Sequence, residues 1–253
     1  MGILIGSTGF VGGHLARSHR FEVQVHRPNL TEIAGLETDL VVCAGLPAEK
    51  WRANKEPAAD WANMAELAQV LATVKAQRAV LISTIDVYQP AVGVDETSPA
   101  QYNGEGAYGA HRAWFEAFFQ SHFGGSLVVR LPGLFAADLR KNLIHDLLHG
   151  RSDQWVGVNP ASRFQFFDTA KAWDVVGWGL QAGISLLNVT SEPVTAQDVA
   201  DLFSVTLASD NPAARYDMRS IHADAFGGAD GYLFSRQSVL AGIAALREVG
   251  VRP

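Results

Sequence analysis

The chain lacks several features that mark particular classes of protein. It has one cysteine, Cys43, among 253 residues, so no disulfide can form within it and a reducing, cytoplasmic setting is expected. No apolar run approaches the ~20 residues that a membrane-spanning helix needs, so we expect no membrane partner. The formal net charge of -6 offers no basic stripe for nucleic acid. Neither is there a pattern of metal ligands, and we expect no metal.

What is present is typical of a folded enzyme-sized domain. Hydrophobic residues make up 48% of the chain and charged residues 18%, which allows a sizeable core. The first apolar run has no basic region before it and leads directly into glycines. It therefore predicts a strand and not a signal peptide.

Strand-like and helical patterns alternate through the first half of the chain. The near-continuous apolar runs are typical of strands buried on both faces of a parallel sheet, and they cover residues 2–5, 21–26, 39–44, 79–83 and 126–131. Helical patterns lie between them at residues 10–18, 57–75 and 107–119. This order predicts an α/β fold with a doubly wound parallel sheet.

One connection in this pattern is short. Only residues 27–38 separate the second strand from the third, which leaves room for one short helix near residues 30–36. We therefore predict that the sheet lacks one edge strand and that the second strand forms its edge.

The second half is less regular. Helices are predicted at residues 139–149, 169–180, 195–204 and 235–249, with strand-like pieces at 164–167 and 186–189. We interpret residues 1–135 as the sheet domain and residues 136–253 as a small substrate-binding lobe interleaved with the end of the sheet.

A glycine-rich turn follows the first strand. It consists of Gly6, Ser7, Thr8, Gly9, Phe10, Val11 and Gly12, and a helix begins directly after it. Glycines at such a turn let backbone N–H groups approach a pyrophosphate, as in Rossmann folds that bind dinucleotides. An ordinary glycine turn is the alternative, but the strand before it and the helix after it favour a cofactor site.

The spacing G-x-x-G-x-x-G resembles that of the extended short-chain dehydrogenase/reductase family. The segment Ser83-Thr84-Ile85-Asp86-Val87-Tyr88 is similar to the family's S-[ST]-x-x-V-Y. The resemblance implies a catalytic hydroxyl at Thr84, a cofactor contact at Ser83 and a substrate contact at Asp86. A strand-end threonine bound to nearby backbone is the alternative for Thr84.

Tyr108 and Arg112 occupy the positions of the family's Y-x-x-x-K motif, one helical turn apart. The resemblance implies that Tyr108 exchanges a proton with the substrate and that both residues contact the cofactor. Arginine replaces the usual lysine; it stays cationic but has a different hydrogen-bonding geometry. Glu116, one turn further on, is an alternative partner for Arg112. His111 is a second acid/base candidate, although a solvated surface histidine is the default.

Further segments resemble family motifs, including those of its dTDP-4-dehydrorhamnose reductases. They imply cofactor contacts at Cys43, Ala44 and Gly45 and at Pro132, Gly133 and Leu134, and a substrate contact at Asn142. Arg140, Lys141 and Arg163 are candidates for the cationic pocket that a substrate diphosphate requires, and solvated surface residues are the alternative. Asn63 matches a helix asparagine of the family, and a bond to nearby backbone is its equally weighted alternative. Cys43 itself sits in an apolar run that favours burial.

The end of the second strand bears on the choice of cofactor. An acid there would bind a ribose diol and exclude a 2'-phosphate, but the chain has His26 and Arg27. We therefore expect NADP, with NAD possible, as a ligand of both residues.

The motifs together imply an NAD(P)-dependent oxidoreductase or epimerase that acts on a nucleotide sugar or a similar carbonyl or carbinol compound. A dehydratase is disfavoured because Ile85, not an acid, follows Thr84. The alternative is a cofactor-binding sensor or scaffold that has lost turnover, which the arginine at position 112 motivates. A homodimer through the helices at residues 57–75 and 107–119 is the family's habit.

Overall fold

The computed structural model describes residues 1–100 and 106–249, so the last residues of the predicted lobe, 250–253, lie outside it. The chain forms two compact units that alternate along the sequence. The first contains Met1–Gln89, Ser98–Leu131 and Ala170–Leu187, and the second contains Pro90–Thr97, Pro132–Thr169 and Asn188–Pro253. Each is described below by itself.

The first unit is built on a six-stranded sheet, with β1 (Gly2–Ile5), β2 (Val23–Val25), β3 (Glu37–Cys43), β4 (Lys75–Thr84), β6 (Leu127–Leu131) and β10 (Leu186–Asn188). Its order is β10-β6-β4-β3-β1-β2, and the β1–β2, β1–β3, β3–β4 and β4–β6 pairings are parallel. The predicted doubly wound sheet is confirmed, and β2 forms its edge. The short 3-10 helix η1 (Arg27–Ile33) occupies the connection where another strand was missing from the sequence pattern.

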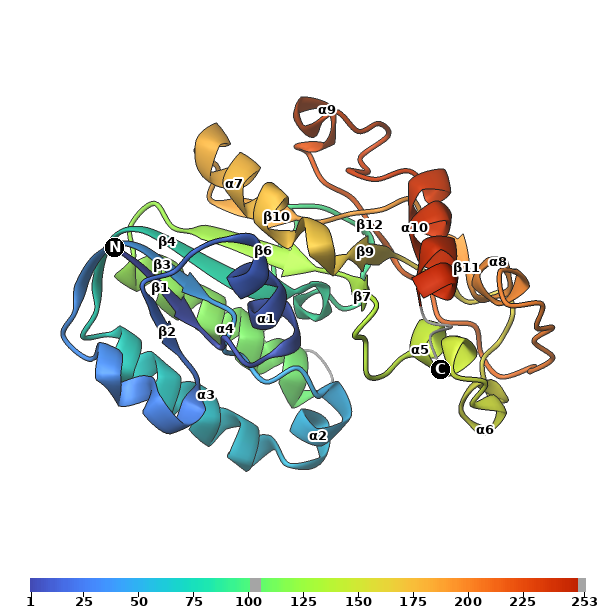
Figure 1. Ribbon diagram of the computed structural model, residues 1–253, viewed down its shortest axis with the longest axis horizontal. Coiled ribbons are helices and arrows are strands. Elements are labelled where there is room, and N and C mark those ends of the chain that lie inside the picture. The colour runs from blue at the N-terminus through green and yellow to red at the C-terminus, as the bar shows by residue number, and fades with distance from the viewer. Residues whose placement is uncertain (101–105, 250–253) are drawn as a thin grey trace. The chain divides into compact units, whose positions relative to one another are not determined.

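Helices cover both faces of this sheet (Figure 1). α3 (Pro57–Leu71) and α4 (Ala107–His122) pack against each other on one face, and α1 (Phe10–Ser18) packs against α7 (Ala172–Ala182) on the other. Gly179 lets α7 approach the sheet, since a Cβ there would lie 2.7 Å from Leu127 Cδ2. The sheet and the helices on its two faces form three layers, and this packing holds the ends of the strands in place at one edge of the sheet.

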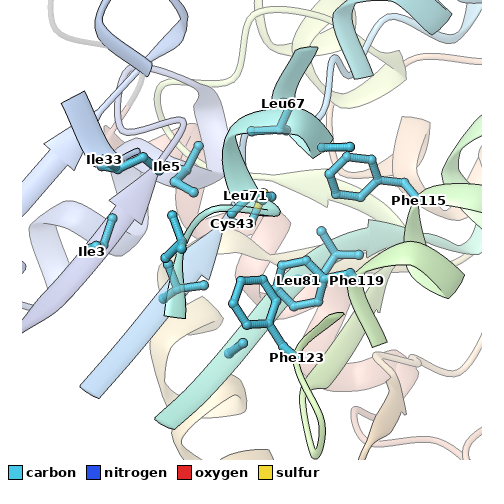
Figure 2. Packing of buried hydrophobic residues seen from close by; sticks show 14 of the residues in the cluster. Ile3, Ile5, Ile33, Cys43, Leu67, Leu71, Leu81, Phe115, Phe119 and Phe123 are labelled. Atoms are coloured by element: carbon cyan, nitrogen blue, oxygen red, sulfur yellow. The ribbon is translucent and has the colours of Figure 1, made fainter. Parts of the chain in front are cut away.

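Apolar side chains from the sheet and from α3 and α4 form the main core of this unit (Figure 2). The figure shows Leu67 and Leu71 of α3 near Ile5 and Cys43, and the rings of α4 near Leu81. Cys43 is fully buried, as its apolar run predicts. Alternate residues of the buried strands supply this layer, so the core places the carboxyl ends of β1, β3 and β4 next to one another.

Several predicted boundaries are wrong. The helix expected at residues 57–75 ends at Leu71, and β4 already begins at Lys75. The helix expected at 139–149 begins only at Leu143, because Asn142 adopts φ +117° and caps it. The helix α2 (Lys50–Lys55) was not predicted, since its six residues carry no apolar period.

The described part of the second unit, which ends at residue 249, contains three short strand pairs. β5 (Val92–Val94) pairs with β12 (Asp217–Met218) and β7 (Gly133–Phe135) with β9 (Phe166–Asp168), both parallel, while β8 (Arg163–Phe164) and β11 (Val194–Thr195) are antiparallel. Its helices are α5 (Leu143–Leu148), α6 (Ser152–Trp155), α8 (Ala196–Asp201), α9 (Ala223–Phe226) and α10 (Arg236–Val249). Among residues 1–100 and 106–249, every helix is too short or too polar to traverse a bilayer.

Candidate active site

The glycine turn after β1 requires glycine at two positions. Gly6 has φ +85°, and a Cβ there would lie 2.4 Å from the carbonyl oxygen of Ala44 at the end of β3. A Cβ on Gly12 would lie 2.0 Å from the carbonyl oxygen of Gly6. Because the clashing atoms are backbone, no side chain can be accommodated by a small shift. The turn therefore holds the start of α1 tightly against the ends of β1 and β3.

The first turn of α1 is suited to an anion. Gly9 is its N-cap, no side chain caps the helix, and no acid lies in the first turn. Thr8 and Gly9 are exposed. The unsatisfied N–H groups and the positive end of the helix dipole therefore meet at an accessible turn.

Thr84 and Tyr108 come together at the carboxyl end of β4, as the sequence motifs imply. Thr84 Oγ1 accepts a hydrogen bond from the Asp86 N–H at 3.2 Å, and its hydroxyl is near enough to the Tyr108 phenol to lower the pKa of that phenol. Gly109 makes this approach possible: a Cβ there would lie 2.1 Å from the Asp86 carbonyl oxygen, so α4 begins in direct contact with the turn after β4.

The phenol of Tyr108 has a raised pKa. Burial is the largest cause, and the Asp86 carboxylate adds to it. The charge of Arg112, the hydrogen bond with Thr84 and the charge of Lys50 act in the opposite direction without cancelling the effect of burial. Tyr108 is therefore protonated around neutral pH and is suited to donate a proton.

Arg112 is held by a set of acceptors from three residues. Its Nη1 donates to Asp60 Oδ2 at 2.6 Å and to the Tyr108 carbonyl at 3.2 Å, while its Nη2 donates to Asp60 Oδ1 at 2.8 Å and to the Pro47 carbonyl at 2.6 Å. The side chain is 1% exposed, and its guanidinium carbon lies 3.9 Å from the centroid of the Tyr108 ring. The guanidinium group of Arg112 is therefore fixed against the ring of Tyr108.

The bonds above account for all but one of the N–H groups of Arg112. A guanidinium has five N–H groups, and the four on the Nη atoms match the four bonds above. The fifth, on Nε, is buried and has no acceptor among the described residues. Arg112 therefore has no accessible donor for a ligand in this arrangement.

The alternative that Arg112 pairs with Glu116 is wrong. Glu116 Oε2 instead accepts from Arg130 Nη2 at 2.6 Å, and its Oε1 accepts from the Ser83 hydroxyl at 2.5 Å. Arg130 Nη1 donates to the Tyr88 hydroxyl at 2.5 Å. Ser83 is thus part of a buried network behind β4, and its hydroxyl is already engaged.

Asp60 contacts two side chains at once. Besides Arg112, the ring Nδ1 of His111 lies 2.8 Å from Asp60 Oδ2. Burial would raise the pKa of Asp60, but the hydrogen bonds from Arg112 and His111 hold it below its usual range. The default of a solvated surface histidine is wrong for His111, because its side chain is only 18% exposed.

The residues expected to select the cofactor lie at the edge of the sheet. Arg27 Nη2 donates to Asn63 Oδ1 and lies 3.4 Å from Glu66 Oε2, and the Arg27 side chain is 61% exposed. Asn63 therefore bonds a side chain and not nearby backbone. The His26 N–H bonds Asn29 Oδ1 at 2.8 Å.

A pocket of about 180 Å³ is lined by Arg27, Pro47, Glu49, Arg52, Ala53, Glu56, Ala59, Asp60 and Asn63.

Of the expected substrate residues, Asp86 belongs to the first unit, whereas Arg140, Asn142 and Arg163 belong to the second. The Asn142 side chain accepts from the His145 N–H at 3.2 Å and donates to the Leu134 carbonyl at 2.9 Å, so it caps α5 and ties it to β7. Arg140, Lys141 and Arg163 are exposed, Pro132 is buried, and Gly133 packs against Phe166.

Sequence reasoning missed the partners that surround Tyr108. Asp60 and Pro47 hold Arg112, Asn54 Oδ1 accepts from the Tyr108 N–H at 3.0 Å, and Lys50 Nζ lies 2.6 Å from Asp86 Oδ1. An acid on a helix is normally solvated, so Asp60 gave no signal of its own. The arginine at position 112 was the signal, because a buried guanidinium requires a carboxylate.

No protein-family model matches the chain, and no curated protein resembles it in sequence. Solved structures with the same fold do exist. A dTDP-4-dehydrorhamnose reductase from Yersinia enterocolitica matches with a TM-score of 0.72 and 12% identity over 99% of each chain. A UDP-glucose 4-epimerase from Thermotoga maritima, solved with UDP-glucose, has a TM-score of 0.71 and 14% identity over 98% of each. RMD from Pseudomonas aeruginosa, complexed with NADPH, has a TM-score of 0.71 and 18% identity over 99% of each.

Proposed function

We propose that the protein is an NAD(P)-dependent oxidoreductase of the extended short-chain dehydrogenase/reductase type, acting on the carbonyl or carbinol group of a nucleotide sugar or a similar compound. The observation that carries this proposal is the Tyr108 phenol at the carboxyl end of β4, near enough to the Thr84 hydroxyl and to Arg112 for both to lower its pKa. The glycine turn ends β1 in the same sheet. Ligands of open α/β sheets bind beyond the carboxyl ends of the strands. Structures of the same fold include a dTDP-4-dehydrorhamnose reductase, a UDP-glucose 4-epimerase with UDP-glucose, and RMD complexed with NADPH.

The residues of the glycine turn fit a dinucleotide. Any side chain at Gly6 or Gly12 would clash with backbone, and the first turn of α1 is exposed, uncapped and free of acids. These features suit a pyrophosphate bound by backbone N–H groups. Ala44 and Gly45, at the end of β3, border the same turn. When bound, the nicotinamide would supply or accept the hydride.

The chain's own residues would handle the proton. Tyr108 donates its hydroxyl proton to the substrate oxygen, and Thr84 Oγ1 holds that oxygen and the phenol in one hydrogen-bonded group. The raised pKa of Tyr108 keeps this proton in place before the reaction, which favours the reductive direction. The Arg112 charge beside the ring stabilises the phenolate that remains.

Arg27 supports NADP over NAD. It is an exposed guanidinium just after the edge strand, which is followed by His26 and Arg27 where an acid would repel a 2'-phosphate. Its bonds to Asn63 and Glu66 are at the surface, where exchange for a phosphate is inexpensive.

A specific observation favours one second candidate, a cofactor-binding sensor without turnover. All four Nη donors of Arg112 are used within the protein, and its Nε is inaccessible. A lysine in this position of the family would keep a donor for the ribose. A site without that donor can retain binding of the pyrophosphate and lose the chemistry.

One experiment separates the two candidates. Purified protein is incubated with NADPH and a panel of nucleotide-4-ketosugars, and NADPH oxidation is followed for the wild type, Tyr108→Phe and Thr84→Val. If the protein is an enzyme, turnover should fall by about 10²-fold or more in Tyr108→Phe, while its affinity for NADPH is retained. NADPH binding without turnover across the panel supports the sensor instead, and a wild type that binds no dinucleotide overturns both.

A further inference from the structure

We infer that Lys50 is a positioning residue for the proton chemistry of Tyr108 and supplies the accessible ammonium that position 112 lacks. This inference rests on the proposed function and extends it. When Tyr108 gives up its proton, a phenolate remains in a buried site, and a nearby cation lowers its free energy. The sequence motif points only to Arg112 for that cation.

Arg112 performs this task incompletely. Its charge is matched by the Asp60 carboxylate, which accepts from both Nη atoms, and the Pro47 and Tyr108 carbonyls complete its bonds. At 1% exposure the guanidinium cannot turn toward a ligand. Arg112 therefore acts as a fixed charge against the face of the ring and gives no hydrogen bond near the hydroxyl.

Lys50 is brought to the site by the helix that sequence reasoning missed. Asn54 Oδ1 of α2 accepts from the Tyr108 N–H at 3.0 Å, which ties α2 to the first turn of α4. Lys50 lies one turn before Asn54 and so shares its face of α2. The Pro47 carbonyl bound to Arg112 ties the preceding loop to α4 as well. The segment from Pro47 to Asn54 is therefore held against the first turns of α4 at both of its ends.

The ammonium of Lys50 reaches the turn that touches Tyr108. Its Nζ lies 2.6 Å from Asp86 Oδ1, the Asp86 N–H donates to Thr84 Oγ1, and both Thr84 and Lys50 lower the pKa of the phenol. Gly109, next to Tyr108, packs directly on the Asp86 carbonyl. Lys50 is 48% exposed, so its flexible stem keeps the ammonium accessible beside this turn while it contacts the carboxylate.

Charged side chains of opposite sign face the phenol. Arg112 of α4 and Lys50 of α2 favour the phenolate, whereas Asp86 of the turn after β4 opposes it. Asp60 and His111 contact Arg112 and not the hydroxyl. Removal of Lys50 leaves Asp86 without its neutralising partner, so the pKa of Tyr108 is expected to rise further. Removal of the Asp86 carboxylate is expected to lower it.

The test measures the phenol directly and needs no substrate. Phenolate absorbance is recorded in a stopped-flow pH jump, before alkaline unfolding, and the signal of Tyr108 is obtained by subtracting Tyr108→Phe. Lys50→Gln is compared with Lys50→Arg and with Lys55→Gln, the matched control on the same helix. We expect an upward shift for Lys50→Gln, restoration of most of it by Lys50→Arg, no shift for Lys55→Gln, and a downward shift for Asp86→Asn.

Activity provides the second measurement. With a ketosugar that the wild type reduces, Lys50→Gln is expected to lower kcat by about tenfold while the KM for NADPH stays within about twofold. Equal phenol titrations for Lys50→Gln and Lys55→Gln would overturn the role of Lys50, whatever the activity. A wild type without turnover but with the Lys50-dependent shift would instead refute the enzyme and leave the electrostatic role standing. Should Lys50→Gln fail to fold, Lys50→Arg and Asp86→Asn carry the same comparison.

Discussion

Replacing Asp60 with alanine removes the carboxylate that fixes Arg112. In the wild type this carboxylate accepts two bonds from Arg112, at 2.6 and 2.8 Å, and lies 2.8 Å from a ring nitrogen of His111. Asp60 is 5% exposed and Arg112 is 1% exposed. Asp60→Ala therefore leaves a guanidinium buried without a counter-charge, and the folded state must bear the desolvation of that charge.

The magnitude follows from this geometry. Removing one partner of a buried ion pair destabilises a protein by about 3–5 kcal/mol. In a chain of this length that lowers Tm by roughly 6–20 °C. The double variant Asp60→Ala/Arg112→Met removes both charges, and it is expected to recover much of the loss, since an apolar pair is often as stable as a buried ion pair.

The effect of pH has a definite sign. The pKa of Asp60 is lower in the folded chain than in the unfolded one. Its stabilising contribution is therefore complete above the ordinary carboxyl pKa and is lost as the pH falls through the lowered value. The difference in unfolding free energy between wild type and Asp60→Ala should be constant near neutral pH and should shrink below about pH 4.

Urea denaturation followed by circular dichroism measures these differences. Glu66→Ala is the control on the same helix, because Glu66 is 56% exposed and lies 3.4 Å from Arg27 in a surface pair; its loss should stay below about 1 kcal/mol. If Asp60→Ala loses no more than Glu66→Ala, the reasoning about the buried pair is refuted. A double variant less stable than the single one would refute it equally.

Three other predictions concern the turn, the edge strand and the core. Gly12→Ala should weaken NADPH binding at least about tenfold, since its Cβ would meet the Gly6 carbonyl. The control Gly13→Ala should leave binding within about twofold, because its Cβ meets atoms only at 3.6 and 3.7 Å. The fluorescence of bound NADPH measures both affinities. Arg27→Gln should weaken NADPH binding about tenfold and NADH binding little, and an equal loss for both would contradict its contact with the 2'-phosphate. Burial raises the pKa of the Cys43 thiol to about 12, so a disulfide reagent at pH 8 should label it only after denaturation, and rapid labelling of the native protein would show that the strand opens.

Much of the first unit could be predicted because its signals are local. Buried strands are near-continuous apolar runs, and the bounds of β1 and α1 agree with the prediction to the residue. The missing edge strand was readable from chain length alone, because residues 27–38 cannot hold a helix and a strand. Strand–helix alternation then leaves few sheet orders.

The partner of Arg112 was not predictable in the same way. Asp60 and Glu116 are both helix acids within plausible reach of an arginine, and sequence spacing favoured Glu116, one turn away. The packing of α3 against α4 brings Asp60 to Arg112, while β6 brings Arg130 to Glu116. An ion pair between elements depends on how those elements pack, which no local pattern records.

The amino-acid sequence by itself determined the parallel sheet with its second strand at the edge, the glycine turn and the positions of Thr84 and Tyr108, since apolar periodicity and backbone sterics act over a few residues. Only the tertiary structure decided which charges surround the phenol. Asp60, Lys50 and Asp86 arrive from separate elements 22 to 58 positions away from Tyr108 in the chain. Electrostatic energy depends on distance in space, so the same motif can place very different charges around one tyrosine.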